Sequence, residues 1–171
     1  MLKTLSTRAL ATGTAIAAAT VCIPAPALAA TVGGVLNTNA TVTANCTVST
    51  SPIAFGNVDS TSASDVDAAG GLTITCTNGS GWTASADVGS GSGASYANRR
   101  MTSGANLLNY NIYTTAARVT VWGDGTGSTA TIGGTGTGSA QAVTVYGRVP
   151  GGQTSVPIGS YADTVAVTVT Y

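Results

Sequence analysis

The strongest constraint on the fold of this sequence is an alternation of apolar and polar residues that recurs along the chain after residue 30. In a β-strand, residues i and i+2 lie on the same face, so a two-residue period predicts strands that bury one face. The β-branched residues threonine and valine, which are abundant here, also favour strands over helices. The pattern predicts strands within residues 72–76, 82–88, 108–113, 119–122, 143–146 and 161–171. No helical period competes with it, and the sequence therefore predicts an all-β protein.

Turn signals separate these predicted strands. Glycine and serine cluster at residues 89–95, 123–128 and 133–139, where we expect loops. Asn78 and Gly79, a pair that favours tight hairpin turns, follow the strand at 72–76. Short strands joined by turns are typical of two packed sheets. With no linker and no clear internal repeat, residues 45–171 are predicted to form one immunoglobulin-like β-sandwich domain.

The first thirty residues have a different composition. Lys3 and Arg8 precede an uncharged, alanine-rich stretch over residues 9–23, and alanines flank Leu28 on both sides. A basic end, an apolar middle and a small-residue cleavage site are the three parts of a secretory signal peptide. The apolar stretch is too short and too rich in alanine to predict a membrane span. We therefore expect residues 1–29 to be a signal peptide and the mature chain to be exported.

Two cysteines, Cys46 and Cys76, remain after removal of the predicted signal peptide, which takes Cys22 with it. Exported proteins meet an oxidising compartment, where cysteine pairs form disulfides. A metal site would need further ligands, which this chain without histidine does not offer. One disulfide between Cys46 and Cys76 is therefore expected.

The sequence ends within its most regularly alternating run, residues 161–171. There Val165, Val167, Val169 and Tyr171 share one face, and no turn or charged tail follows them. An apolar edge strand exposes unpaired backbone groups, and native proteins rarely leave such an edge uncovered. We therefore expect a neighbouring strand to cover this run, and these four residues are the predicted edge that accepts it. If the sandwich lacks its last strand, a groove into the core is also open there.

A candidate for the missing strand lies at the start of the predicted mature chain. Residues 30–44 carry no charge, and their even positions are mostly apolar or small. Such an extended segment can add itself to the open sheet of another subunit, where backbone hydrogen bonds and alternate side chains provide affinity. The predicted donor residues are Val32, Gly34, Leu36, Thr38, Ala40 and Val42. The same alternation fits a first strand of the chain's own domain, so both interpretations stay open at this point.

Seven short stretches occur in an order and spacing that extend over nearly the whole mature chain. They are CTV at 46–48, IAFG at 53–56, LTITCT at 72–77, RRM at 99–101, WGDG at 122–125, VYGRVP at 145–150 and GSYADTV at 159–165. Together they resemble the spore coat protein U domain, the subunit type of archaic (Csu-type) chaperone–usher pili.

This resemblance implies an incomplete immunoglobulin-like β-sandwich that is completed by donor-strand complementation. A periplasmic chaperone would fill the groove first, and an outer-membrane usher would exchange it for the N-terminal strand of the next subunit. Carried onto this sequence, the donor strand is about residues 30–42, the accepting edge is 163–171, and the family disulfide joins Cys46 to Cys76. The implied function is that of a structural pilus subunit at the cell surface, which pairs with neighbouring subunits and supports adhesion and biofilm formation.

Other function classes find little support in the sequence. The chain has no histidine and no glutamate, and no nucleophile has a base beside it, so we expect neither an enzyme nor a cofactor. Four arginines in the mature chain are too few to neutralise a run of phosphates, which argues against nucleic-acid binding. Asp59, Asp65 and Asp67 lie close together but lack a calcium-loop pattern, so no metal site is expected.

The alternative to a fibre subunit is a self-complete secreted sandwich that binds a ligand, such as a carbohydrate. Trp82 and Trp122 could stack on a sugar, although a place in the core is the expected role for both. Arg99 and Arg100 are expected to be solvated. Arg148 could cap a strand end or pair with Asp163, although neither role is the favoured one.

Overall fold

The structure is a computed structural model that describes residues 26–171, and this part of the chain contains strands but no helix. Residues 26–171 therefore include no helix that is long and apolar enough to cross a membrane. The chain divides into two units, Met1–Asn39 and Ala40–Tyr171. In the first unit, residues 26–39 have no regular secondary structure and their side chains are exposed. The signal peptide predicted for residues 1–29 lies outside the described residues except for its last four.

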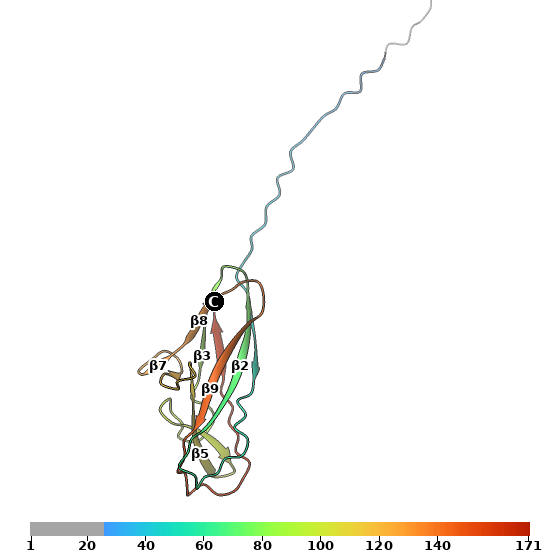
Figure 1. The fold of residues 1–171 in the computed structure, drawn as a ribbon. Coiled ribbons are helices and arrows are strands. Elements are labelled where there is room, and N and C mark those ends of the chain that lie inside the picture. The colour runs from blue at the N-terminus through green and yellow to red at the C-terminus, as the bar shows by residue number, and fades with distance from the viewer. Residues whose placement is uncertain (1–25) are drawn as a thin grey trace, which may run out of the picture. The chain divides into compact units, whose positions relative to one another are not determined.

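The second unit is a β-sandwich of two sheets (Figure 1). Its strands are β1 (Cys46–Ser51), β2 (Val66–Cys76), β3 (Gly81–Ala86), β4 (Arg99–Ser103), β5 (Asn106–Tyr113), β6 (Val121–Trp122), β7 (Thr129–Ala130), β8 (Ile132–Thr135), β9 (Gln141–Val149) and β10 (Val167–Thr170). The larger sheet has the order β1-β2-β9-β5-β6-β7, with β4 paired to β5 beside this path. The smaller sheet has the order β10-β3-β8. The all-β sandwich predicted from the alternation is confirmed.

The core lies between the two sheets and is built from alternate residues of the strands. Its buried members are Leu72, Ile74, Cys76, Trp82, Ala84, Ala86, Met101, Leu108, Tyr110, Ile112, Trp122, Val145 and Val149. Both tryptophans belong to this core, as expected from the sequence. Trp122 is 2% exposed, and its indole Nε1 donates a hydrogen bond to the carbonyl oxygen of Ala84 at 3.1 Å. Most of the remaining core side chains are aliphatic, so the two sheets pack against each other mainly through valine, leucine, isoleucine and alanine.

The strands predicted at 72–76, 82–88, 108–113 and 143–146 overlap β2, β3, β5 and β9. Two expectations are wrong. The glycine cluster at 133–139 was expected to be a loop, but β8 runs through its first residues. Gly134 lies so close to Trp82 that a Cβ there would overlap the indole ring. Glycine here marks a close approach between a strand and a large side chain. The run at 161–171 forms a regular strand only over Val167–Thr170, since the residues before it leave one sheet for the other.

The disulfide expected from the sequence joins Cys46 to Cys76. The two residues stand directly opposite each other in β1 and β2, and the bond closes a loop with a sequence separation of 30. It therefore ties the edge strand β1 to the larger sheet at the end where β1 begins.

Replacing Cys46 and Cys76 together with alanine is expected to lower the free energy of unfolding by about 3–4 kcal/mol, because the unfolded chain regains the freedom of the closed loop. Urea unfolding of the exported protein and of the double variant, followed by tryptophan fluorescence, measures this difference. A reduced wild-type sample should match the variant. Equal unfolding midpoints for oxidised wild type and variant would contradict the role assigned to the bond.

Candidate functional site

The two flanks of the sandwich differ. At one flank β7 ends at Ala130 in the larger sheet and β8 begins at Ile132 in the smaller sheet, so Thr131 alone links the two sheets there. At the other flank the edge strands are β1 and β10. Within residues 26–171, no strand pairs with the outer edge of either of them. The sandwich is thus closed by its own chain on one flank and left open on the other.

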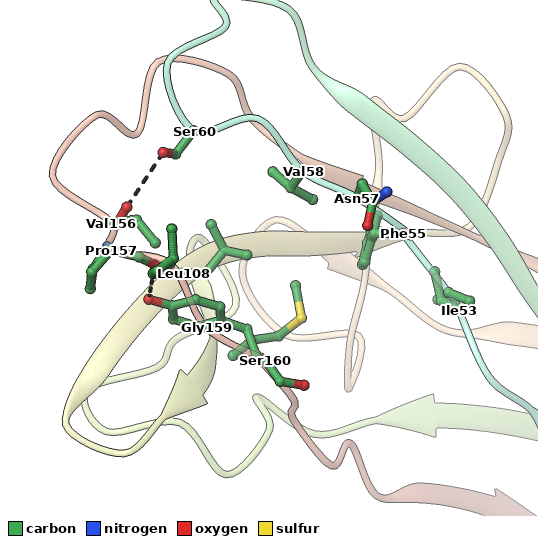
Figure 2. Close-up of a pocket in the computed structure, with 15 residues that line it drawn as sticks. Ile53, Phe55, Asn57, Val58, Ser60, Leu108, Val156, Pro157, Gly159 and Ser160 are labelled. Atoms are coloured by element: carbon green, nitrogen blue, oxygen red, sulfur yellow. Dashed lines mark hydrogen bonds between the residues drawn. The ribbon is translucent and has the colours of Figure 1, made fainter.

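Two neighbouring hollows lie along the open flank. The first, of about 570 Å³, lies between residues 53–60 and residues 156–161 (Figure 2). The second, of about 420 Å³, lies between residues 50–55 and residues 161–167. Ile53, Phe55, Met101 and Tyr161 line both hollows. We call the two hollows together the open groove, with residues 50–60 as one wall and residues 156–167 as the other.

The floor of the open groove is the inner face of the larger sheet. The side chains that reach it come from strands β2, β4, β5, β6 and β9, and all are core residues: Leu72, Met101, Tyr110, Ile112, Trp122 and Val145. The hollow thus reaches down to core side chains, although these residues are themselves only 2–9% exposed. Filling it with apolar side chains would remove that surface from water at a gain of about 25 cal/mol for each Å².

Two glycines allow one wall of the groove to lie close to the sheet. A Cβ at Gly70 would overlap Ile53, and a Cβ at Gly147 would overlap Ile53 and Phe55. Phe55 also packs edge-on against Tyr110, with the ring centroids 6.2 Å apart. Ile53 and Phe55 are not among the site residues predicted from the sequence. Their alternation around Ala54 is the signal that could have found them, because two apolar residues with a period of two indicate a short extended segment with one apolar face.

The opposite wall of the first hollow is a loop. In Figure 2 this loop carries Val156 and Pro157 and faces the segment that carries Val58 and Ser60. The two walls meet through one long hydrogen bond, which the Ser60 hydroxyl donates to the Val156 carbonyl oxygen at 3.4 Å. Ile158, in the same loop, is fully exposed at the rim of the groove. Ile158 thus adds an exposed apolar side chain to a hollow whose lining also includes the polar residues Asn57, Ser60 and Ser160.

The free edge of β1 presents backbone groups from residues whose side chains point inward. The N–H of Thr77 donates to the carbonyl oxygen of Asn45 at 2.9 Å, so Asn45 and Thr77 are a hydrogen-bonded pair. Because such pairs alternate along an antiparallel ladder, Cys46, Val48 and Thr50 direct their N–H and C=O groups away from β2. β1 therefore offers unpaired backbone groups at the open flank, beside the groove.

The edge of β10 has the same property. The N–H of Asp87 donates to the carbonyl oxygen of Ala166 at 3.0 Å, so the alternate residues Val165, Val167 and Val169 direct their backbone groups away from β3. These three valines are half-buried against the core, and the first two line the groove. The fourth residue predicted for this edge, Tyr171, is 55% exposed and lies outside β10.

The predicted donor residues belong to no strand, and their side chains are exposed. Residues 26–45 contain no strand, and the first strand of the domain is β1. Val32 is 101% exposed, Leu36 87% and Val42 85%, and Gly34, Thr38 and Ala40 are exposed as well. The described residues thus combine an uncovered apolar groove with a separate segment whose apolar side chains have no cover.

The charged residues of the sandwich have structural partners. The pairing of Arg148 with Asp163 that the sequence suggested does not occur. Arg148 donates from Nε to Asp67 Oδ1 at 2.7 Å, and its Nη1 lies 3.1 Å from Asp65 Oδ2. Asp67 stands opposite Arg148 in the β2–β9 ladder, which explains the choice of partner. The hydrogen bond from Arg148 holds the pKa of Asp67 below its usual value. Within residues 26–171, no three potential metal-ligating side chains come together.

The expectation that Arg99 is solvated is wrong, because its side chain is fully buried. Its guanidinium donates from Nη1 to Asn111 Oδ1 at 2.7 Å and from Nη2 to the carbonyl oxygens of Asp87 at 2.6 Å and Trp122 at 2.8 Å. The Tyr96 ring lies 5.4 Å below the guanidinium carbon. Burial lowers the pKa of Arg99. Arg99 thus ties the ends of β3 and β6 to the middle of β5.

Comparisons with known proteins agree with this architecture. The family model described as Spore Coat Protein U domain matches residues 33–168. Protein U of Myxococcus xanthus is 33% identical over 172 residues, which cover 91% of this chain and 93% of that protein.

A solved structure is similar in fold. It is the CsuC–CsuE chaperone–tip adhesion subunit pre-assembly complex from the archaic chaperone–usher Csu pili of Acinetobacter baumannii. The similarity has a TM-score of 0.54 at 20% sequence identity and covers 77% of this chain and 40% of the matched chain. The open sandwich and the match over residues 33–168 lead to one conclusion: the chain belongs to the Spore Coat Protein U domain family.

Proposed function

We propose that the chain is a structural subunit of a surface fibre and that the N-terminal segment of a neighbouring copy fills the open groove as the missing strand. The observation that carries this proposal is the open flank, where core side chains form the floor and β1 and β10 offer free backbone groups on both sides. An added strand would bond to both edges and cover the floor. Because donor and acceptor are different surfaces, the contact repeats head to tail and builds an open fibre.

Residues 30–44 have the properties that such a strand needs. They are uncharged, they are not part of any strand of their own domain, and they include as many residues as the edge and wall over 46–60. The donor face consists of Val32, Gly34, Leu36, Thr38, Ala40 and Val42. Fully burying Val32, Leu36 and Val42 would contribute on the order of 5–9 kcal/mol before the cost of ordering the segment.

A subunit with an open apolar groove needs a temporary occupant before its neighbour arrives, because uncovered edges and apolar surface lead to aggregation. We assign this role to a periplasmic chaperone and the exchange step to an outer-membrane usher. The similar Csu structure is itself a chaperone–subunit pre-assembly complex, which supports the assignment. The Cys46–Cys76 disulfide supports an oxidising compartment outside the cytoplasm. The fibre would then serve adhesion and biofilm formation at the cell surface.

The test compares two neighbouring positions of the donor segment. Leu36→Asp places a charge on the face that would enter the groove, whereas Val35→Asp places the same charge on the opposite face of an extended strand. Both residues are equally exposed in the described structure, at 87% and 89%. We expect Leu36→Asp to reduce the yield of multimers by at least about tenfold and Val35→Asp to leave it near the wild-type level. The measurement is a gel of unboiled samples of the exported protein, in which multimers appear as a ladder that collapses on heating.

Two outcomes would count against the proposal. Equal ladders from both variants would mean that the donor face is wrong. A wild-type chain that stays a stable monomer without a chaperone would instead favour the self-complete, ligand-binding sandwich.

A further inference from the structure

The accepting edge is not one continuous strand. Ala162 exchanges two backbone hydrogen bonds with Thr102 of β4, at 2.8 and 3.0 Å, and β4 is paired with the larger sheet. From Val167 onward the chain pairs with β3 of the smaller sheet. Residues 163–166 therefore carry the chain from one sheet to the other and have no regular ladder of their own.

The carboxylate of Asp87 binds the end of this crossing segment. Its Oδ1 accepts hydrogen bonds from the N–H of Ala166 and from the N–H of Gly89, both at 2.9 Å. The N–H of Asp87 donates in turn to the carbonyl oxygen of Ala166 at 3.0 Å. Asp87 is itself held, because the buried Arg99 donates to its carbonyl oxygen from Nε at 3.1 Å and from Nη2 at 2.6 Å. Both backbone groups of Ala166 are thus bound to one anchored residue.

The carboxylate of Asp163 binds the start of the segment. Its Oδ1 accepts from the N–H of Ser90 at 2.8 Å, from the Ser90 hydroxyl at 2.7 Å and from the N–H of Thr164 at 2.8 Å. Its Oδ2 accepts from the Tyr110 hydroxyl at 2.7 Å. Burial, followed by the hydrogen bond to Asp163, raises the pKa of Tyr110, so the phenol keeps the proton that it donates.

Gly89 completes the arrangement. Its φ is +86°, a backbone conformation that favours glycine, and a Cβ there would overlap the carboxylate of Asp163. The turn after β3 thus has the one residue type that admits the Asp163 side chain. The two aspartates together, which we call the aspartate pair, fix the crossing segment at both ends.

The aspartate pair determines which backbone groups reach the open flank. With Ala166 bound to Asp87, the alternation of an antiparallel ladder turns the N–H and C=O groups of Val165 and Val167 outward. A slip of one residue would turn these groups toward β3 and would move the valine side chains out of the groove. Asp163 lines the second hollow, so it acts directly beside the place where an added strand would lie.

We propose that Asp87 and Asp163 are positioning residues for strand capture. They hold residues 163–166 in the register in which the side chains of Val165 and Val167 point inward. In this register the backbone groups of Val165 and Val167 face an incoming strand. This inference rests on the proposed function, because it concerns the same groove and the same donor segment.

The test measures peptide binding to the full exported chain carrying Leu36→Asp, which keeps its own groove free. The probe is a fluorescent peptide of residues 30–44 with the wild-type sequence. We expect Asp163→Asn to raise the dissociation constant of the peptide by about tenfold or more, because the amide keeps one accepting oxygen instead of two and lacks the negative charge that strengthens the carboxylate's bonds. Tyr110→Phe, which removes one of these four bonds, should raise it by about threefold.

Asp124→Asn is the matched control. The Asp124 carboxylate also accepts bonds from a neighbouring N–H and from two hydroxyls, of Thr126 and Thr129, but it does not line the groove. Its variant should change the dissociation constant by less than about twofold. The fraction of folded protein, from tryptophan fluorescence, corrects each value, so a merely structural role of Asp163 would leave the corrected dissociation constant unchanged.

The outcomes separate the two proposals. If the Leu36→Asp parent takes up no peptide, the proposed function fails. If the parent binds the peptide and Asp163→Asn binds it equally well, the proposed function stands and the role of the aspartate pair is wrong. If Asp163→Asn does not fold, Tyr110→Phe decides, and an unchanged dissociation constant for that variant would overturn the inference.

Discussion

Arg99→Met is expected to lower the free energy of unfolding by at least about 4 kcal/mol, because it leaves buried acceptors without donors. The guanidinium donates to three acceptors, the carbonyl oxygens of Asp87 and Trp122 and the Asn111 amide oxygen, at 2.6–2.8 Å for the shortest bond to each. Methionine fills a similar volume but donates nothing. Urea unfolding followed by the fluorescence of the buried tryptophans measures the loss.

Arg100→Met is the control for this experiment. Arg100 follows Arg99 in the same strand, but its side chain is half-buried and donates one hydrogen bond, to the carbonyl oxygen of Ser92 at 3.1 Å. Its replacement should cost about 1 kcal/mol. A similar loss for both variants would mean that the buried network around Arg99 contributes nothing special to stability.

This pair of arginines shows a limit of prediction from the sequence. Arg99 and Arg100 are adjacent and identical, and the expectation from the sequence was that both are solvated. What buries Arg99 is a set of acceptors from β5, β6 and the end of β3, which are distant in the sequence. No local periodicity in the sequence indicates that these acceptors surround Arg99. The alternation in 72–76 and 108–113, by contrast, predicted β2 and β5 because burial of one face is a local property of a strand.

The candidate site was predictable to a similar extent. The alternation of Val165, Val167 and Val169 correctly identified residues that face the core along the edge of the smaller sheet. The groove beside these valines could not be predicted, because it forms between segments that are distant in the sequence. Neither the loop over 156–160 nor the wall over 53–58 has a sequence pattern that indicates a groove between them. Asp163 illustrates the same limit. The sequence offered Arg148 as one candidate partner, but strand register pairs Arg148 with Asp67, and Asp163 accepts hydrogen bonds from Tyr110 and Ser90.

If the proposed function is right, a fused donor strand should keep the chain monomeric. The change appends a second copy of residues 30–44 after Tyr171 through a short turn that contains glycine. If the appended segment fills the open groove of its own chain, no groove remains for a neighbour. We expect the multimer ladder to disappear and the free energy of unfolding to rise, by less than the roughly 5–9 kcal/mol from burial of the copies of Val32, Leu36 and Val42, because ordering the appended segment offsets part of that gain. The same fusion with the equivalent of Leu36→Asp in the appended copy should restore the ladder.

The length of linker that the fusion needs also indicates the direction of the added strand. Thr170 stands opposite Thr83, near the start of β3, and Cys46 stands opposite Cys76, at the end of β2, so β10 ends where β1 begins. A segment that runs antiparallel to β10 can enter the groove there after a tight turn, whereas a parallel one needs a linker as long as the groove. In a fibre, an antiparallel donor leaves the groove at the opposite end and continues into its own sandwich, so successive subunits follow in line. A fusion that becomes monomeric only with a linker of about a dozen residues or more would indicate a parallel donor and would exclude this arrangement.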